Sequence, residues 1–340
     1  MKTLIYSAEQ DLAPCGELIR QGELVCFPTE TVYGLGANAF DEKAVVKIFD
    51  VKNRPANNPL IVHISDPLML RDIVTEIPAD IQELTERFWP GPLTVVLPRK
   101  NTIPPIVSAG LSTVAVRCPQ HPVALKLIET AGVPIVAPSA NLSGRPSPTN
   151  LSHCEEDLRG KVAAIIDGGN CDIGVESTVL LPLGNKRVRI LRPGGITPEM
   201  LAMAGYIPEL DPAILEPVKE GQEVLSPGML HKHYAPKAPM TIVTGDPEAV
   251  CKAISQKQGP DVWVLAFDEY MDRFEQAISF GSEKDSYAQS KVLFDALRAF
   301  DELPCKQIYA MDPPEDGVGL AVRNRLLRAA SFRIVPAERL

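Results

Sequence analysis

The segment that sets the fold is Leu24-Val25-Cys26-Phe27-Pro28-Thr29-Glu30-Thr31-Val32-Tyr33-Gly34-Leu35-Gly36, an apolar run followed by a polar stretch with two glycines. The run has the length and composition of a buried strand. Ligands of open α/β sheets gather where strands end, so the polar stretch is a candidate binding loop. Its hydroxyls stand at alternate positions, and its glycines would let the backbone approach a ligand. The alternative is an ordinary turn that contains glycine.

Similar apolar runs alternate with helical periods up to about residue 204, which is typical of an α/β protein. We expect strands at residues 24–27, 60–64, 93–97, 114–116, 134–136, 163–166, 178–181 and 188–191. The last two are joined by a link too short for a crossover helix. The sequence therefore predicts a mixed, open twisted sheet with flanking helices.

The periodicity fades from Gly205 to Pro239, where prolines recur, and this segment is predicted to be a linker. A second alternation follows, with strands at 241–243, 262–267 and 307–311 and helices from 247, near 286–300 and near 318–330. We therefore predict a catalytic domain over residues 1–204, a linker or lid over 205–239 and a small Rossmann-like α/β domain over 240–340. Neither a G-x-G-x-x-G nor a Walker A motif is present in the sequence.

The composition limits the classes of function. The 340 residues carry a formal net charge of −9, which argues against a surface that binds nucleic acid throughout, so an anionic ligand would be captured locally. The seven cysteines are scattered and include no C-x-x-C pair, as expected for reduced thiols. No apolar run approaches the length of a membrane span, and we expect a cytoplasmic protein.

Two cations and several amides stand in the segment Lys52-Asn53-Arg54-Pro55-Ala56-Asn57-Asn58-Pro59-Leu60. The preceding residues, 43–51, have the helical period, and the prolines prevent the helix from continuing. We expect both cations just past the helix end, in an extended segment where residues two apart point to one side. They would suit the phosphates of a nucleotide triphosphate. The alternative is a solvated pair of surface charges.

Two other predicted strands carry polar residues. His63 lies on an otherwise apolar face of its strand, where the simpler interpretation is a satisfied core histidine. Arg117 ends a strand and shares a face with Thr113. A buried arginine needs an anion, which could be a structural carboxylate or the carboxylate of a substrate bound to its planar fork.

Polar loops follow three further strands. The loop after residues 134–136 contains Ser139, Asn141 and Ser147, which suit phosphates and ribose but could equally cap a helix. Ser177 precedes one strand, and Arg192 ends the next. In the predicted linker, His231 and His233 stand two apart without a third ligand, so we predict no metal site in the protein.

Taken in order, these motifs resemble those of the threonylcarbamoyl-AMP synthase family, the YrdC-like enzymes, in the long form with a linker and a C-terminal domain. The resemblance covers about 200 residues and rests on Pro28–Leu35, Lys52-x-Arg54-Pro55, Asn58-Pro59-Leu60, Phe88–Thr94, Val116-Arg117, Ala137–Asn141 with Ser143-Gly144, Ser177-Thr178 and Arg192-Pro193-Gly194. It implies a YrdC-like N-terminal domain. It also implies an enzyme that converts L-threonine, bicarbonate and ATP to threonylcarbamoyl adenylate and pyrophosphate, for threonylcarbamoyl-adenosine modification of tRNA.

The resemblance also implies roles for individual residues. The cations Lys52 and Arg54 would act in catalysis. The residues that would bind ATP are Lys52, Arg54, Asn58, Thr113, Ser139, Asn141, Ser147, Arg192 and Tyr234. The residues that would bind threonine are Thr31, His63, Arg117, Ala137 through its backbone, and Ser177. Mg²⁺ is implied by ATP, although no carboxylate ligand for it can be named.

Two other classes of function share some of these features. An RNA-binding module could grip phosphates in a basic cleft without catalysis, but the acidic composition and the threonine-sized set of polar groups disfavour it. A carbamoyl-transfer maturation enzyme would need additional modules, such as cysteine-rich zinc pairs, which the chain lacks. The expected partners are the small substrates and the downstream tRNA-modifying machinery, and direct contact with tRNA is left open.

Overall fold

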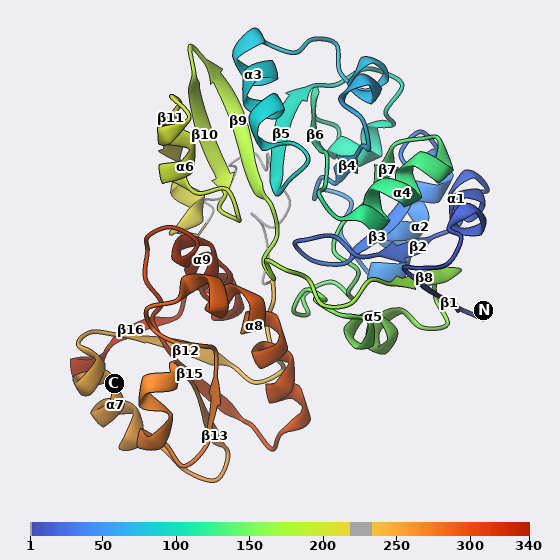
Figure 1. The fold of residues 1–340 in the computed structure, drawn as a ribbon. Coiled ribbons are helices and arrows are strands. Elements are labelled where there is room, and N and C mark those ends of the chain that lie inside the picture. The colour runs from blue at the N-terminus through green and yellow to red at the C-terminus, as the bar shows by residue number, and fades with distance from the viewer. Residues whose placement is uncertain (1, 218–232) are drawn as a thin grey trace. The chain divides into compact units, whose positions relative to one another are not determined.

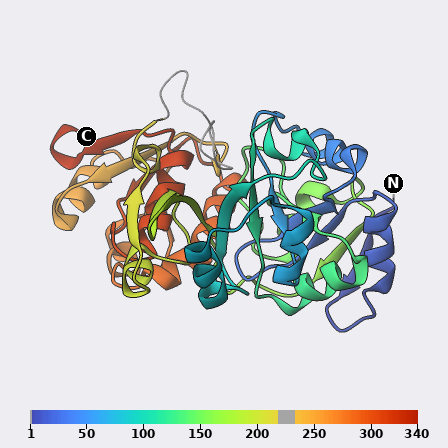
Figure 2. The same cartoon turned by 90° about the horizontal axis from the view of Figure 1, so that it is seen from above.

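The computed structural model describes residues 2–217 and 233–340. Contacts divide these residues into two units: the first comprises 2–143 and 147–214, and the second comprises 144–146, 215–217 and 233–340. In Figure 1 and Figure 2 most of the first unit is coloured from blue to yellow-green, and residues 233–340 of the second are coloured from orange to red. No helix in the described ranges is long and apolar enough to cross a membrane.

The first unit is built on one mixed sheet, which confirms the predicted fold class. Its strands lie in the order β1 (Leu4–Ser7), β8 (Ala164–Asp167), β2 (Val25–Phe27), β3 (Gly34–Asn38), β7 (Ile135–Val136), β4 (Ile61–His63), β6 (Thr113–Arg117), β5 (Leu93–Pro98), β9 (Thr178–Gly184), β10 (Arg187–Arg192) and β11 (Ile207–Leu210). Strand β6 is parallel to β4 and antiparallel to β5, whereas β9 and β10 form a hairpin. All eight predicted strands are present.

Six helices accompany this sheet in the described part of the first unit: α1 (Ala13–Arg20), α2 (Glu42–Lys52), α3 (Ala79–Phe88), α4 (Pro122–Ala131), α5 (Leu151–Leu158) and α6 (Pro198–Met203). Helices α1 and α4 pack against each other and against β2 and β8, and Ile19, Phe27 and Leu127 are fully buried there. Helix α2 begins at Asp41, whose side chain accepts from the Lys43 amide at 2.9 Å. It ends at Asn53, which has a left-handed backbone.

The sequence interpretation missed strand β3. The sequence predicts Gly34 and Gly36 to be loop residues that let a backbone approach a ligand, but both lie in β3, which pairs with β2 and β7. A Cβ atom at Gly36 would lie 2.9 Å from the Phe27 ring and 2.9 Å from the Ile135 side chain. Close packing against neighbouring strands therefore accounts for this glycine, and with only Leu35 and Ala37 as apolar side chains the strand has a weak hydrophobic pattern.

The second unit contains a parallel sheet, as the Rossmann-like pattern predicts. Its order is β14 (Ala277–Ser279), β13 (Val262–Ala266), β15 (Gln307–Met311), β12 (Met240–Thr244) and β16 (Ile334–Pro336). Helices α7 (Pro247–Ser255), α8 (Ser286–Ala299) and α9 (Gly319–Ala329) connect the strands. Helix α7 begins after Asp246, whose carboxylate accepts from two backbone amides and caps the helix.

The segment predicted as a linker, 205–239, has more structure at its start than its prolines indicate. Ile207–Leu210 form β11, which pairs in parallel with β10, and a short 3-10 helix follows at Pro212–Ile214. Residues 218–232 lie outside the described part of the chain, and so does His231. The domain boundaries drawn from the sequence stay predictions.

Candidate active site

The centre of the site is formed where adjacent strands of the mixed sheet end. Strand pairing sets His63 of β4 beside Arg117 of β6, and Arg117 beside Thr94 of β5. All three side chains are buried. Strand register therefore gathers an imidazole, a guanidinium and a hydroxyl from segments that are far apart in the sequence.

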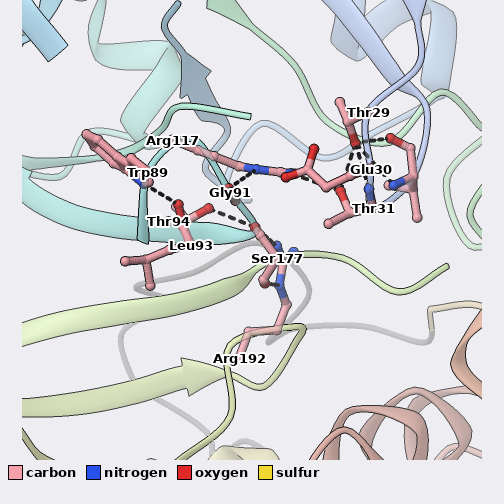
Figure 3. A network of polar contacts seen from close by, with 11 residues as sticks. Thr29, Glu30, Thr31, Trp89, Gly91, Leu93, Thr94, Arg117, Ser177 and Arg192 are labelled. Atoms are coloured by element: carbon pink, nitrogen blue, oxygen red, sulfur yellow. Dashed lines mark hydrogen bonds and ion pairs between the residues drawn. The ribbon is translucent and has the colours of Figure 1, made fainter. Parts of the chain in front are cut away.

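The Arg117 guanidinium contacts the loop that opens the sequence motif. Its Nη1 donates to Thr31 Oγ1 at 2.9 Å, its Nε donates to the Gly91 carbonyl at 3.3 Å, and its Nη2 lies 2.7 Å from Glu30 Oε1. Figure 3 shows the Glu30 and Arg117 side chains pointing toward each other. Both are almost fully buried, at 5% and 3% exposure. The fork of the arginine is thus fixed in direction before any ligand binds.

Ser177 and Arg192 adjoin this centre. The Ser177 hydroxyl lies 2.7 Å from Thr94 Oγ1, and Arg192 donates to both the carbonyl and the hydroxyl of Ser177, at 3.0 and 3.1 Å (Figure 3). A Cβ atom at Gly194 would lie 2.3 Å from the Glu176 carbonyl oxygen, so only glycine lets the Arg192 loop pack this closely. The close packing fixes a second arginine beside the centre.

His63 is a neutral group in this site. Burial lowers its pKa to about 3, and the charge of Arg117, with a smaller contribution from Arg192, acts in the same direction. Its ring meets the Phe27 ring edge-on, with centroids 6.1 Å apart. At neutral pH the imidazole can therefore donate or accept a hydrogen bond, but it adds no charge.

Lys52 is held by a different kind of partner. Its Nζ donates to the Ser139 carbonyl at 2.6 Å and also to the Asn141 carbonyl, while the Ser143 amide donates to the Lys52 carbonyl at 2.9 Å. Within the loop, the Ser139 hydroxyl donates to Asn141 Oδ1 at 2.5 Å. Burial lowers the pKa of Lys52 to about 7, and the Arg54 charge contributes further. The lysine thus ties the end of α2 to the polar loop.

The expected extended arrangement of Lys52 and Arg54 is wrong. Lys52 is the last residue of α2, and Asn53 then turns the chain with φ of 51°. Arg54 Nη2 donates to the carbonyls of Asn58 and Pro59, at 3.3 and 3.1 Å. The left-handed residue between the two cations, which the sequence did not signal, changes their directions.

Ser147 is fully buried, and its hydroxyl donates to Glu176 Oε1 at 2.5 Å. Glu176 directly precedes Ser177, so this carboxylate connects the loop that carries Ser139 and Asn141 with the segment that meets Arg192. The predicted ATP and threonine residues therefore adjoin each other at this point of the first unit.

Three further predicted residues are described separately. Thr113 begins β6, four residues before Arg117, which corresponds to roughly 13 Å along a strand. The Ala137 amide donates to the Ile61 carbonyl at 2.9 Å, so its carbonyl is the backbone group that it could offer to a ligand. Tyr234 belongs to the second unit, where its ring packs on Phe294 with centroids 5.2 Å apart.

The sequence interpretation gave no role to Glu30, Thr94 or Glu176. Glu30 and Thr94 stand inside motifs that we used, and Glu176 directly precedes Ser177. An acidic residue between two threonines after a buried strand is the signal that could have drawn attention to Glu30. Its contact with Arg117 depends on tertiary structure and has no local pattern.

The fold and the contacts define a class of protein: an α/β protein with a buried cluster of charged and polar side chains at the ends of its strands. Arginine and lysine side chains line the site, and its histidine is neutral. Within the described ranges, no group of three or more His, Cys, Asp or Glu residues could hold a metal ion. Such a site suits positioning and charge stabilisation.

Comparison with known protein families shows which family the chain belongs to. The model of the Sua5/YciO/YrdC family, described as telomere recombination, matches residues 17–194, and a model described as the C-terminal domain of threonylcarbamoyl-AMP synthase matches residues 196–331. The chain therefore belongs to the Sua5/YciO/YrdC family, and it carries the C-terminal domain of the threonylcarbamoyl-AMP synthases.

Individual relatives are similar to this chain over nearly its whole length. The threonylcarbamoyl-AMP synthase of Bacillus subtilis is 46% identical over 333 residues, which cover 96% of this chain and 95% of the relative. That of Pyrococcus abyssi is 45% identical and covers 93% of each. The crystal structure of P. abyssi Sua5 complexed with L-threonine matches with a TM-score of 0.91 at 41% identity, over 99% of both chains. These relatives confirm the resemblance seen in the sequence and do not favour the RNA-binding alternative.

Proposed function

We propose that the protein joins L-threonine, bicarbonate and ATP to form L-threonylcarbamoyladenylate and pyrophosphate. It is a nucleotidyltransferase that supplies the activated intermediate for threonylcarbamoyl-adenosine modification of tRNA. The observation that carries this conclusion is the match, over 99% of both chains, to the P. abyssi protein that was crystallised with L-threonine. The buried arginine centre of the first unit is the feature of this chain that suits such a ligand.

The chemistry fits a site that has no nucleophilic side chain. The threonine amine first becomes a carbamate, with bicarbonate as the carbon source and with loss of water and a proton. A carbamate oxygen then attacks the α-phosphorus of ATP in line, and the bond to pyrophosphate breaks. Catalysis of such a transfer depends on alignment and on the stabilisation of spreading negative charge, which fixed arginine and lysine groups supply.

For the nucleotide, we assign the triphosphate to Lys52, Arg54 and Asn58. Ser139, Asn141 and Ser147 would complete that site, because Lys52 already binds the loop that carries them. Arg192 would neutralise charge near the transferred phosphorus. Thr113 and Tyr234 keep their assignment to ATP as proposals from the family resemblance.

For threonine, we assign the carboxylate to the Arg117 fork, which matches a carboxylate bidentately. Nε and Nη1 of Arg117 donate to protein oxygens and Nη2 faces Glu30, which leaves one N–H group on each of Nη1 and Nη2 for a ligand. Thr31, His63 and Ser177 would surround the side chain of the amino acid. The neutral His63 suits a hydroxyl group, and the Ala137 carbonyl could accept from the amine.

Magnesium would enter with ATP. The described residues do not form a metal site, so phosphate oxygens and water would supply most of its ligands, and no step of the mechanism is assigned to it. We place the reaction in the cytoplasm, which all seven cysteines support, because none of them forms a disulfide. The product would pass to the machinery that modifies tRNA.

Pyrophosphate release by the purified chain tests the proposal. Release should require ATP, bicarbonate and L-threonine together, and the adenylate should be detected by mass spectrometry. Omission of each component in turn provides the controls. Equal release with serine or without an amino acid would contradict the assigned substrate.

A further inference from the structure

Glu30 is a buried carboxylate for which the nucleotide and threonine assignments give no role. Only 5% of the residue is exposed, and Arg117 Nη2 lies 2.7 Å from its Oε1 atom. Among the residues that the structure describes, neither carboxylate oxygen of Glu30 accepts a hydrogen bond. Buried charged groups are normally hydrogen-bonded as well as paired, so this one has unused acceptor capacity.

The position of Glu30 limits what could use this capacity. It lies between Thr29 and Thr31, and the Thr31 hydroxyl accepts from the same guanidinium that Glu30 faces. An anionic ligand group that binds Arg117 would therefore lie close to an acidic group. A ligand that carried only negative charge would be repelled there, whereas one with a cationic group beside its carboxylate would fit.

An amino acid has this pattern of charge. Its α-carboxylate and α-ammonium are joined through one carbon atom, and an ammonium group can donate three hydrogen bonds. The Arg117 and Glu30 side chains together present one positive and one negative charge, which complement those two groups. The net charge of the pair is zero, as is that of the free amino acid.

We propose that Glu30 binds the α-ammonium group of the substrate amino acid, while Arg117 binds its carboxylate. This inference rests on the proposed threonine site. It adds to that site a residue that binds the ammonium group, which threonine has and a simple hydroxy acid lacks. Glu30 is then a specificity-determining residue for the entry of the amine. The structural alternative is that Glu30 only holds Arg117 in position.

Calorimetric binding of two ligands to the full chain separates these roles. The ligands are L-threonine and (R)-3-hydroxybutyrate, which has the same carboxylate and hydroxyl but no amine. Wild-type protein should bind the hydroxy acid about a hundredfold more weakly. Glu30→Gln should weaken threonine binding by about tenfold or more and leave hydroxybutyrate binding within about threefold or make it tighter.

Three results would overturn the inference. Equal affinity of the wild type for both ligands would remove the need for an amine-binding group. If Glu30→Gln lowers the affinity for both ligands by the same factor, Glu30 acts only through Arg117. If it raises both affinities by the same factor, Glu30 competes with the ligand carboxylate. If Glu30→Gln does not fold, Glu30→Asp serves, because its shortened carboxylate should reduce the discrimination, and unchanged discrimination would contradict the role.

Two further variants complete the design. Glu176→Gln removes another buried carboxylate of the site, one that accepts from Ser147, and it should leave the ratio of the two affinities unchanged. Arg117→Ala should lower the affinity for both ligands. If it lowers neither affinity, the proposed threonine site itself is wrong. That result differs from any failure that is confined to the Glu30 variants.

Discussion

The two cationic ends of the site are neutralised in different ways. Arg117 faces the Glu30 carboxylate at 2.7 Å and is supported by a hydroxyl and a carbonyl. Lys52 donates instead to carbonyl oxygens of the loop from Ser139 to Asn141, which carry no formal charge. One end therefore pairs its cation directly with a carboxylate, whereas Lys52 at the other end is bound by neutral oxygens, with the charges of Arg54 and Asp157 nearby.

The difference follows the charge of the ligands that we assign to each end. An amino acid brings both signs of charge, and a triphosphate brings only negative charge. Burial, and to a smaller extent the Arg54 charge, lowers the pKa of Lys52, so the charged ammonium is unfavourable in the empty site, and a bound polyanion would stabilise it. At the first end, Arg117 and Glu30 already pair with each other. Variants at each end should therefore affect different substrates.

The largest effect should follow from Arg117→Ala. It removes the fork that we assign to the threonine carboxylate and leaves Glu30 as a buried, unpaired charge. We expect a loss of about a hundredfold to a thousandfold in threonine affinity, and a loss of about 3–5 kcal/mol in the free energy of unfolding. Calorimetry with threonine and chemical denaturation measure the two effects. ATP affinity should change little, and a comparable loss of ATP binding would contradict the separation of the two ends.

Arg54→Ala should impair the use of ATP and leave threonine binding unchanged, the reverse of the effect expected for Arg117→Ala. If Arg54 stabilises the transferring phosphates, kcat/KM with ATP as the varied substrate should fall by about a hundredfold or more, while threonine affinity stays near that of the wild type. Arg159→Ala, an exposed arginine that pairs with Glu155 on α5, is the matched control. Steady-state pyrophosphate release measures the rates, and an unchanged rate in Arg54→Ala would exclude the assigned role.

The features of the site that depend on local sequence pattern could be predicted from the sequence. The strands that carry His63, Thr94 and Arg117 are short apolar runs, and their ends could be located from hydrophobicity alone. The candidate residues were found because several of them follow such strands. A mixed sheet could also be inferred, since one link is too short for a crossover helix.

The parts that could not be predicted depend on contacts between distant segments. Strand β3 lacks an apolar pattern because its glycines fit against Phe27 and Ile135. The burial of Lys52 depends on carbonyls of a loop that lies far along the chain. The pairing of Glu30 with Arg117 likewise needs the register between strands, so the charge balance that separates the two ends was visible only in the structure.

The lowered pKa of Lys52 makes the end of the site that we assign to the triphosphate, here called the phosphate end, sensitive to pH. Burial lowers this pKa to about 7, so the ammonium loses its proton as the pH rises through neutrality, and ATP affinity should fall by up to about tenfold from about pH 7.5 to about pH 8.5. Lys52→Arg stays protonated and should show a flatter profile. Calorimetric titration with ATP at each pH tests this, and equal profiles for the two proteins would contradict it. Threonine affinity provides the internal comparison.

The stability contribution of Lys52 has the opposite sign. Its pKa is lower in the folded state than its ordinary value of 10.5, so between about pH 7 and about pH 10.5 the unfolded chain binds more protons at this residue. The contribution of Lys52 to the free energy of unfolding therefore rises with pH across this window, while ATP binding weakens. Denaturation of the wild type and of Lys52→Arg at several pH values measures the difference. A parallel dependence of both proteins would contradict the burial of a titrating lysine.

The smallest effect concerns Tyr234, whose assignment to ATP rests on the family resemblance. In the second unit its ring packs on Phe294 at 5.2 Å and lies 5.9 Å from the Arg325 guanidinium. If Tyr234 contributes to nucleotide retention, Tyr234→Ala should weaken ATP binding by about threefold to tenfold, the range expected for loss of one aromatic contact, and leave threonine affinity unchanged. Tyr234→Phe keeps the ring and separates stacking from the hydroxyl. Since loss of the ring could also disturb the second unit, the melting temperature of each variant is measured beside its ATP affinity. Unchanged ATP affinity in a folded Tyr234→Ala protein would confine this residue to the packing of the second unit, and the phosphate end would then depend on Lys52, Arg54 and Arg192.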